Sequence, residues 1–190
     1  FLVHYGLAGA AVMGHPMGGK TAMRLALEHE RNVGRLIVVD IAPVAYAHTH
    51  RPMVEAMLAV DLAAAGRRAD VDEQLQAAIL EAALRGFMLH NLVSEDGRLK
   101  WRINLAALAA NMDTLIGYPE DLGGHAYGGP AHFIAGAASD YVQEAHHTRI
   151  RELFPKAVID SIPGAGHWVH AEQPATFVER VRSILGVTGN

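Results

Sequence analysis

The sequence predicts an α/β fold, a mostly parallel β-sheet in which strands and helices alternate, with a block of helices inserted into it. Three observations predict this fold. Short apolar runs typical of buried parallel strands occur near both ends of the chain. Segments rich in helix-forming residues follow these runs, as in successive strand–helix units. Between residues 44 and 129 the alternation stops and helical spacing continues on its own.

The first part of the chain is predicted to form a strand–helix–strand unit. Residues 10–13 are a short apolar run that predicts a buried strand. Residues 20–29 are rich in helix formers. Residues 35–40 contain Leu-Ile-Val-Val, which predicts a fully buried strand of a parallel sheet, and this strand ends before Pro43. Residues 1–43 therefore belong to the sheet-forming core.

Residues 44–129 are predicted to form a helical cap. Apolar residues recur at helical spacing between residues 53 and 62, where they either pack the cap on the sheet or line an acyl pocket. Asp70 is a start signal for a second helix. Residues 101–112 predict a third helix, and a glycine-rich stretch at 123–130 marks the loop that ends the cap.

Strand–helix alternation resumes in the last part of the chain. Residues 132–135 and 157–162 predict strands, each followed by a predicted helix, at 143–153 and 174–185. Residues 130–190 therefore complete the core that the first part begins.

The composition narrows the classes of function. Apolar residues are 51% and charged residues 19% of the chain, as in a globular protein, and the net charge of −4 does not favour nucleic acid or an anionic membrane as a partner. The absence of cysteine excludes disulfides, thiol catalysis and cysteine–zinc sites. No apolar run approaches the ~20 residues of a membrane-spanning helix, and no secretory leader is recognisable. We expect a cytoplasmic protein, and no pattern indicates its oligomeric state.

The most informative motif is the turn after the first strand, where residues 14–19 read Gly-His-Pro-Met-Gly-Gly. In the pattern Gly-x-Ser-x-Gly, a strand–turn–helix connection presents a nucleophilic serine. Gly14 and Gly18 occupy the two glycine positions of that pattern. Pro16 occupies the serine position and has no hydroxyl group. The motif therefore predicts a hydrolase scaffold that lacks its usual nucleophile.

Two further positions complete the pattern of a serine hydrolase, which needs a histidine base and a carboxylate beside the nucleophile. In hydrolases that use the Gly-x-Ser-x-Gly turn, these groups follow one another along the chain in the order nucleophile, acid, histidine. Asp140 lies just after the predicted strand 132–135, where the acid is expected. His167 lies in the sequence Gly-Ala-Gly-His-Trp, whose glycines allow a loop to bring the imidazole back to residue 16.

On these residues the sequence resembles the α/β-hydrolase superfamily, and within it small bacterial esterases of the YbfF type. The matching stretches lie at residues 12–23, 36–44, 101–105 and 164–170, so they span almost the whole chain. The resemblance implies a partial α/β-hydrolase fold with an inserted helical cap. It also implies a Ser–His–acid mechanism that hydrolyses a small-molecule carboxylic ester or acyl thioester without a metal or organic cofactor.

The resemblance further implies a role for individual residues. His167 is the expected base, and the backbone N–H of Met17 is an expected donor to the oxyanion. His15 and Trp168, the chain neighbours of the two motif positions, are the expected substrate-binding residues. The family's first strands and a second oxyanion donor are absent, so we expect a missing N-terminal segment ahead of residues 1–6, which look like the end of a helix.

Two aspartates are candidates for the acid. The superfamily usually places this residue after the strand predicted at 132–135, which favours Asp140. The resemblance to esterases of the YbfF type implies that the acid can instead follow the preceding strand, which favours Asp40. Ser139 either bonds to the imidazole or takes part in a local turn. The sequence leaves both aspartates open.

Pro16 is expected to affect both the chemistry and the backbone. Loss of the hydroxyl removes the covalent step, although removal of a triad member typically leaves about 10³–10⁴-fold catalysis over water. The nucleophile of the family has a positive φ, whereas proline holds φ near about −65°. We therefore expect the turn to relax and the Met17 N–H to lose its aim. Alternatively, Pro16 simply opens the following helix.

Other functions compete with the hydrolase hypothesis. Residues 14–21 also satisfy the phosphate-loop pattern, with Lys20 in the lysine position, but nucleotide binding leaves the His167 loop unexplained. The histidine pairs 48/50 and 146/147 lack a carboxylate pattern for a metal, so we expect solvated side chains there. The chain is thus an impaired serine-type hydrolase, a non-catalytic small-molecule-binding protein, or an incomplete fragment without independent function.

Overall fold

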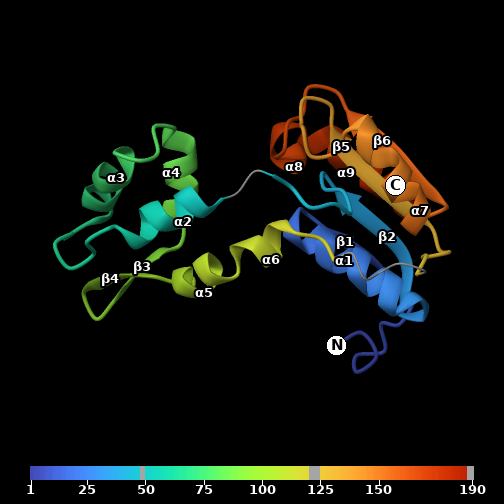
Figure 1. Cartoon of the computed structure of the whole chain (residues 1–190), viewed down its shortest axis with the longest axis horizontal. Helices are drawn as coiled ribbons and strands as arrows, with labels where there is room; N and C mark the ends of the chain where they lie inside the picture. Colours follow the sequence, from blue (N-terminus) through green and yellow to red (C-terminus); the bar gives the residue numbers. More distant parts are fainter. Residues whose placement is uncertain (48–49, 120–124, 188–190) are drawn as a thin grey trace. The chain divides into compact units, whose positions relative to one another are not determined.

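The computed structural model describes residues 1–47, 50–119 and 125–187, and the chain divides into two compact units (Figure 1). The sheet unit consists of Phe1–Ala45 and Tyr118–Asn190, and the helical unit of Tyr46–Gly117. The segment 118–129, which the sequence analysis assigned to the inserted cap, is thus part of the sheet unit. Each unit is described separately.

The sheet unit is built on four parallel strands in the order β1-β2-β5-β6. The register places Val38 of β2 beside Phe133 of β5, and Phe133 beside Ile159 of β6. This arrangement confirms the predicted mostly parallel sheet. The strands are β1 (Ala10–Gly14), β2 (Val33–Val39), β5 (Ala131–Gly136) and β6 (Ala157–Ile162).

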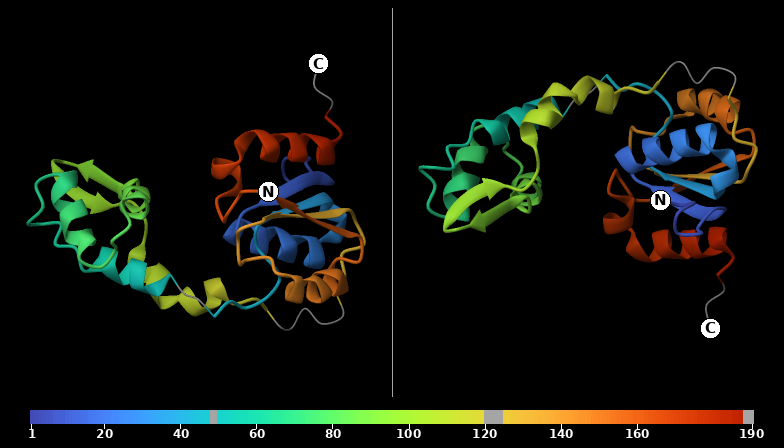
Figure 2. Two further views of the ribbon diagram at one scale, coloured as in Figure 1. Left: turned by 90° about the horizontal axis from the view of Figure 1, so that it is seen from above. Right: turned by 90° about the horizontal axis from the view of Figure 1, so that it is seen from below.

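Helices cover both faces of this sheet, α1 and α7 on one side and α8 and α9 on the other (Figure 2). Side chains of β2 therefore alternate between two cores, as a doubly covered sheet requires. Ile37 and Val39 pack with Phe177 of α9, whereas Phe133 and Phe154 pack on the opposite face. The helices are α1 (Met17–Glu28), α7 (His147–Leu153), α8 (Val169–Glu172) and α9 (Pro174–Leu185), and two short 3₁₀ helices are η1 (Glu30–Asn32) and η2 (Glu144–His146).

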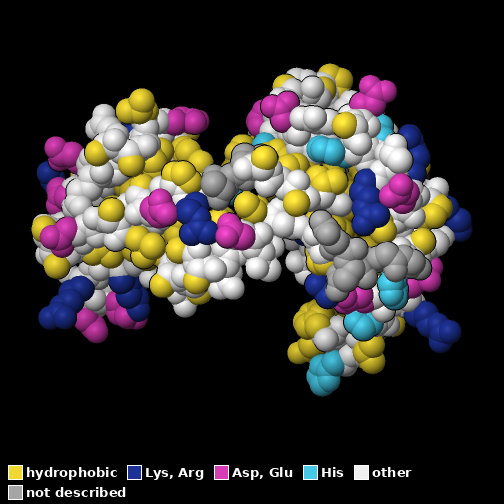
Figure 3. All heavy atoms as spheres, viewed as in Figure 1, with side chains coloured by type: hydrophobic (Ala, Val, Ile, Leu, Met, Phe, Trp, Pro, Cys, Tyr) yellow, Lys and Arg dark blue, Asp and Glu magenta, His cyan; other side chains and the backbone are white. Residues whose placement is uncertain are grey.

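Two N-terminal predictions differ from the structure. Strand β1 lies at the edge of the sheet and is not the buried strand expected from its composition, since Met13 is 52% exposed. Residues 2–6 form turns and not the end of a helix, and Gly6 has φ 65°. Around this segment hydrophobic side chains gather on the surface (Figure 3), and Phe1 and Tyr5 are among the exposed ones. An apolar run therefore predicted the strand but not its exposed position.

The helical unit contains a β-hairpin that the sequence analysis missed. Strands β3 (Leu92–Glu95) and β4 (Arg98–Trp101) pair antiparallel around Asp96 and Gly97, whose φ angles are 51° and 77°. Two successive positive φ values are typical of a tight hairpin turn, and Asp-Gly favours that turn. The helix predicted at 101–112 was therefore wrong in its first part. The helices of the unit are α2 (Arg51–Leu58), α3 (Arg68–Gln76), α4 (Ala82–Leu89), α5 (Leu105–Ala110) and α6 (Met112–Ile116).

The helical unit has its own hydrophobic core. Val54 and Met57 of α2 are buried in it, and Leu75 of α3 and Met88 of α4 pack with them. Most of the apolar residues at 53–62 therefore pack within this unit, whereas Leu58 is 49% exposed. The two expected uses, packing on the sheet and lining an acyl pocket, stay predictions. Among the helices of the described residues, none has the length and apolar character needed to cross a membrane.

Candidate active site

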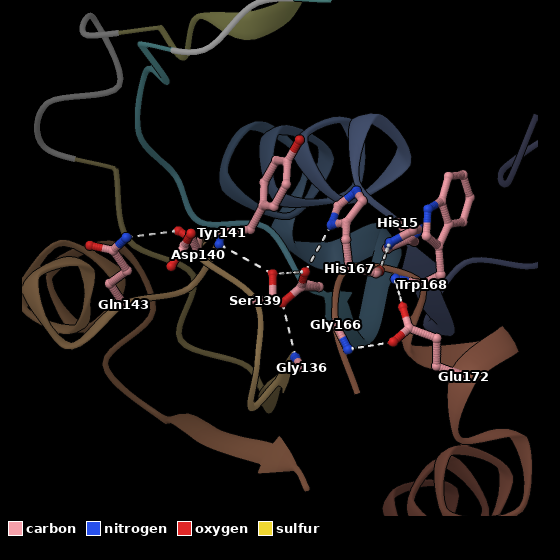
Figure 4. Close-up of polar contacts among 11 residues, drawn as sticks. His15, Gly136, Ser139, Asp140, Tyr141, Gln143, Gly166, His167, Trp168 and Glu172 are labelled. Atoms are coloured by element: carbon pink, nitrogen blue, oxygen red, sulfur yellow. Dashed lines mark hydrogen bonds and ion pairs between the residues drawn. The ribbon is translucent and has the colours of Figure 1, made fainter. Parts of the chain in front are cut away.

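The candidate site lies where four parallel strands end. His15 and Pro16 follow β1, Asp40 follows β2, Ser139 follows β5, and His167 follows β6. Because parallel strands end at the same edge of a sheet, these connections meet there even though they are far apart in sequence. The close-up in Figure 4 shows His15, Ser139 and His167 converging at this edge.

Asp40 and His167 form a direct hydrogen bond across 127 positions of sequence. The imidazole Nδ1 lies 2.8 Å from Oδ2 of the carboxylate. An ionised carboxylate can only accept hydrogen bonds, so Nδ1 carries the proton that it donates. In the neutral ring the lone pair is then on Nε2. The pair thus has the tautomer that a general base requires.

The Asp40 carboxylate is fully buried, with 0% exposure. Besides His167, it accepts a hydrogen bond at 3.0 Å from the backbone N–H of Gly136 and one at 2.5 Å from the hydroxyl of Ser139. The backbone of Asp40 has φ 45°, a conformation that is uncommon for a residue with a side chain. Such strain persists only where the surroundings enforce it, and it often marks functional sites.

The loop that carries His167 is positioned through a close backbone approach. A Cβ atom on Gly136 would lie 2.1 Å from the carbonyl oxygen of Gly166, so only glycine fits at the end of β5. Glu172 of α8 accepts hydrogen bonds from the backbone N–H groups of Gly166 and Trp168, at 2.8 and 3.0 Å. These contacts hold both sides of His167, so its imidazole is fixed by backbone geometry as well as by Asp40.

Aromatic neighbours surround the imidazole of His167. Tyr141 stacks on it, with ring centroids 3.9 Å apart and planes inclined by 20°. Burial, and next the Asp40 charge, raise the pKa of the Tyr141 phenol. The His167 side chain remains 22% exposed. The sequence analysis did not identify Tyr141, since nothing in its local pattern distinguishes it from an ordinary loop tyrosine.

His15 supports His167 from the β1 side. Its Nε2 donates a hydrogen bond at 2.9 Å to the backbone carbonyl of His167, and the two ring centroids are 4.7 Å apart. Burial lowers the pKa of His15, and the hydrogen bond to the His167 carbonyl opposes that shift. Trp168, the other expected substrate-binding residue, is 41% exposed and its ring centroid lies 6.0 Å from that of His15.

At residue 16 the backbone adopts an ordinary helical conformation. Pro16 has φ −71° and ψ −41°, and α1 begins at Met17. The N–H of Lys20 donates to the carbonyl of Pro16 at 3.1 Å, which is the first hydrogen bond of the helix. Both sequence expectations for Pro16 meet here, because the proline opens the helix and the positive φ expected of the family's nucleophile is absent.

Asp140, the second candidate acid, lies on the surface. Its backbone carbonyl accepts a hydrogen bond from the side chain of Gln143 at 3.1 Å (Figure 4). Within the described part of the chain its carboxylate forms no hydrogen bond or ion pair. The structure therefore brings Asp40 to His167 and leaves Asp140 apart, while Ser139 bonds to Asp40 and not to the imidazole.

The turn also lacks the backbone arrangement of a phosphate loop. Only His15 and Pro16 separate the end of β1 from the start of α1. Gly18, Gly19 and Lys20 are already helical, so they do not form the N–H cradle that binds phosphates in such a loop. Burial lowers the pKa of Lys20 to about 8, so the cationic form is less strongly favoured there than on an exposed lysine.

The histidine pairs considered for metal binding show ordinary contacts. His146 Nδ1 accepts a hydrogen bond from the backbone of Gln143 at 3.2 Å. Of the other pair, His48 lies outside the described residues. In the described ranges no group of three or more histidine or carboxylate side chains is arranged to hold a metal ion.

Comparison with known proteins agrees with this arrangement. The model of the alpha/beta hydrolase family matches residues 1–180. The sn-1-specific diacylglycerol lipase ABHD11 of Mus musculus is 42% identical over an alignment of 190 positions that covers 97% of this chain and 61% of that protein. Esterase YbfF of Escherichia coli (strain K12) is 33% identical over 177 residues, which are 93% of this chain and 67% of that protein.

Solved structures show the same likeness. A marine microorganism esterase is 35% identical with a TM-score of 0.89, and the match covers 96% of this chain and 72% of that one. The esterase Rv0045c from Mycobacterium tuberculosis, at 23% identity and a TM-score of 0.57, shares the fold. The chain spans 56–61% of the length of the vertebrate lipases that it matches.

Proposed function

The chain belongs to the alpha/beta hydrolase family, and from its site we propose that it is a carboxylic-ester hydrolase. In this proposal the base and the acid are intact, and proline replaces the nucleophilic serine. The observation that carries this proposal is the hydrogen bond between the buried Asp40 and His167, whose loop contacts His15, the chain neighbour of Pro16. Its named relatives include the esterase YbfF and lipases that act on diacylglycerol. An ester is therefore the preferred substrate class, with an acyl thioester as the alternative.

In the full form of this mechanism a serine at position 16 attacks the ester carbonyl. His167 takes the serine proton and later passes it to the leaving group. Asp40 orients the imidazole and balances its positive charge, which assigns the acid to Asp40 and not to Asp140. The N–H of Met17, at the start of α1, donates to the oxyanion. Each step uses protein groups alone, so we propose no metal or cofactor.

With Pro16 in place, this covalent route is closed. Proline has no hydroxyl, and its helical φ of −71° removes the positive-φ turn that would present one. The Met17 N–H then points along an ordinary helix axis, which weakens its use as an oxyanion donor. We therefore propose that the chain as written is strongly impaired in serine-type hydrolysis. We also propose a cytoplasmic location, because a sequence without cysteine suits a reducing compartment.

A second candidate function is small-molecule binding at the same site without hydrolysis. The lack of a nucleophile at Pro16 favours this candidate. The conformation of Asp40 weighs against it. A positive φ at a fully buried carboxylate reduces stability by about 1–3 kcal/mol unless contacts offset it. Ligand binding alone does not require the tautomer-setting bond between Asp40 and His167.

The test is intact-mass labelling with a fluorophosphonate, applied to the chain as written and to Pro16→Ser. We expect a single adduct on Pro16→Ser and none on the parent. The variant Pro16→Ser/His167→Gln is the matched control and should lose the adduct, because the serine is then not activated. If Pro16→Ser melts cooperatively and stays unlabelled, the proposal is wrong and the binding or fragment hypotheses gain. An adduct on the parent would reveal a different nucleophile.

A further inference from the structure

We propose that the chain as written hydrolyses activated esters without a covalent intermediate, with His167 Nε2 as general base for a water molecule. This inference rests on the proposed function only for the substrate class, an ester. It assigns to this chain an activity that does not pass through residue 16. Pro16 then changes the nucleophile from a serine hydroxyl to water and does not only remove a nucleophile.

The first argument is the protonation pattern of His167. Nδ1 is committed to Asp40 as a donor at 2.8 Å. The lone pair therefore lies on Nε2, which has no hydrogen-bond partner among the described residues. The side chain is 22% exposed, so water has access to part of it, and we infer that this part includes Nε2. An imidazole with this pattern can act as a general base for water, as it does for a serine hydroxyl.

The second argument is preorganisation. Three donors, from His167, Gly136 and Ser139, hold the Asp40 carboxylate. Tyr141 stacks on the imidazole at 3.9 Å, and His15 bonds to the backbone carbonyl of His167. The ring is thus held in place before a substrate arrives. A fixed base loses little orientational freedom when it acts, which is the advantage of a protein site over free imidazole.

The third argument is the chemistry at residue 16. In a serine enzyme the serine hydroxyl is hydrogen-bonded to Nε2 of the histidine. Water takes this position only after the acyl group has been transferred to the serine. Proline offers no proton and no nucleophile, and it lies in the first turn of α1. Water is then the remaining proton donor for Nε2. Pro16 therefore prevents the covalent route and leaves Nε2 available to activate water for the direct route.

The step balances without any other reactant. Nε2 removes a proton from water as the water oxygen forms a bond to the ester carbonyl carbon, which gives a tetrahedral oxyanion. The oxyanion collapses, the bond between carbonyl carbon and leaving oxygen breaks, and the proton on Nε2 passes to that oxygen. The products are a carboxylic acid and an alcohol, and His167 returns to its starting form.

The experiment measures hydrolysis of 4-methylumbelliferyl butyrate by the full 190-residue chain. Because the chain has other histidines that hydrolyse activated esters slowly, the saturable part of the rate is compared. We expect His167→Gln to lower it by at least about 10²-fold, at the low end of general-base catalysis. Asp40→Asn should lower it similarly. The matched controls Asp140→Asn and His90→Gln, both exposed, should stay within about 2-fold of the parent.

Thermal unfolding of each variant separates chemistry from folding. Asp40 is buried, so the His167→Gln variant carries the conclusion if Asp40→Asn melts at a lower temperature. Equal rates in the parent and a folded His167→Gln variant would overturn the inference. So would an acyl adduct seen by intact mass during turnover, because the direct route forms none.

The two proposals fail in different ways. If Pro16→Ser is labelled by the fluorophosphonate while the parent has no His167-dependent rate, only the direct route is wrong. If the parent shows that rate while Pro16→Ser stays unlabelled, the serine-type proposal is wrong and the direct route stands.

Discussion

Two turns at the same edge of the sheet differ in how far they depart from ordinary backbone geometry. After β2, Asp40 adopts φ 45° and is fully buried, with its carboxylate held by three donors. After β1, Pro16 adopts φ −71° and continues directly into α1. The turn at Asp40 keeps a costly conformation, whereas the turn at Pro16 has relaxed. Strain thus persists where the surroundings enforce it, and it is absent where proline forbids it.

The largest change in the free energy of unfolding is expected when a side chain is added to the turn after β1. A Cβ on Gly14 would lie 2.1 Å from the backbone carbonyl carbon of Gly18, so Gly14→Ala should destabilise the chain by about 1–3 kcal/mol or more. Gly18→Ala is the matched control, because a Cβ there meets no atom within 4 Å. Urea unfolding measures both. Equal stability of the two variants would show that the turn is not as close as described.

The next effect compares the two candidate acids. Asp40→Asn should reduce the free energy of unfolding by about 1–3 kcal/mol, because the donors on Gly136 and Ser139 lose the carboxylate that accepts their hydrogen bonds. Asp140→Asn should change it by less than about 0.5 kcal/mol, as for most surface substitutions. Thermal melts of both variants measure the difference. A destabilised Asp140→Asn with an unaffected Asp40→Asn would reverse the assignment of the acid.

A smaller effect concerns pH and His15. Because burial lowers the pKa of His15 below 6.5, the unfolded chain binds a proton at this residue more readily than the folded one. Stability should therefore fall as pH is lowered through about 6.5, and level off below the folded pKa. In His15→Gln the slope of stability against pH should be shallower than in the exposed control His90→Gln. Identical slopes would mean that His15 does not titrate differently on folding.

The smallest effect tests the start of α1 through Lys20. Burial lowers its pKa to about 8, so a large share of its amine is neutral and nucleophilic at pH 8. Lys20 should then react faster with an acylating reagent than the exposed Lys100 and Lys156, as measured by peptide mass spectrometry at pH 8. If Lys20 is the slowest of the three, its burial limits access more than it favours the neutral form.

Much of the fold was predictable because local patterns and long-range structure agree in this chain. The strand at 157–162 and the helix at 174–185 match β6 and α9 in their bounds, since apolar alternation, Pro174 and Gly186 mark them locally. The hairpin of the helical unit was missed because helical spacing outweighed the Asp-Gly signal at residues 96–97. The exposed edge position of β1 has no local signal at all.

The sequence by itself determined which chemical groups are present: an imidazole at 167, two candidate carboxylates and no hydroxyl at 16. Only the tertiary structure decided between the carboxylates, because the choice depends on which strand ends lie side by side. The connection after β2 brings Asp40 within 2.8 Å of Nδ1, and the loop after β5 leaves Asp140 exposed. A residue type is written in the chain, whereas a hydrogen bond across 127 positions exists only when the sheet is assembled.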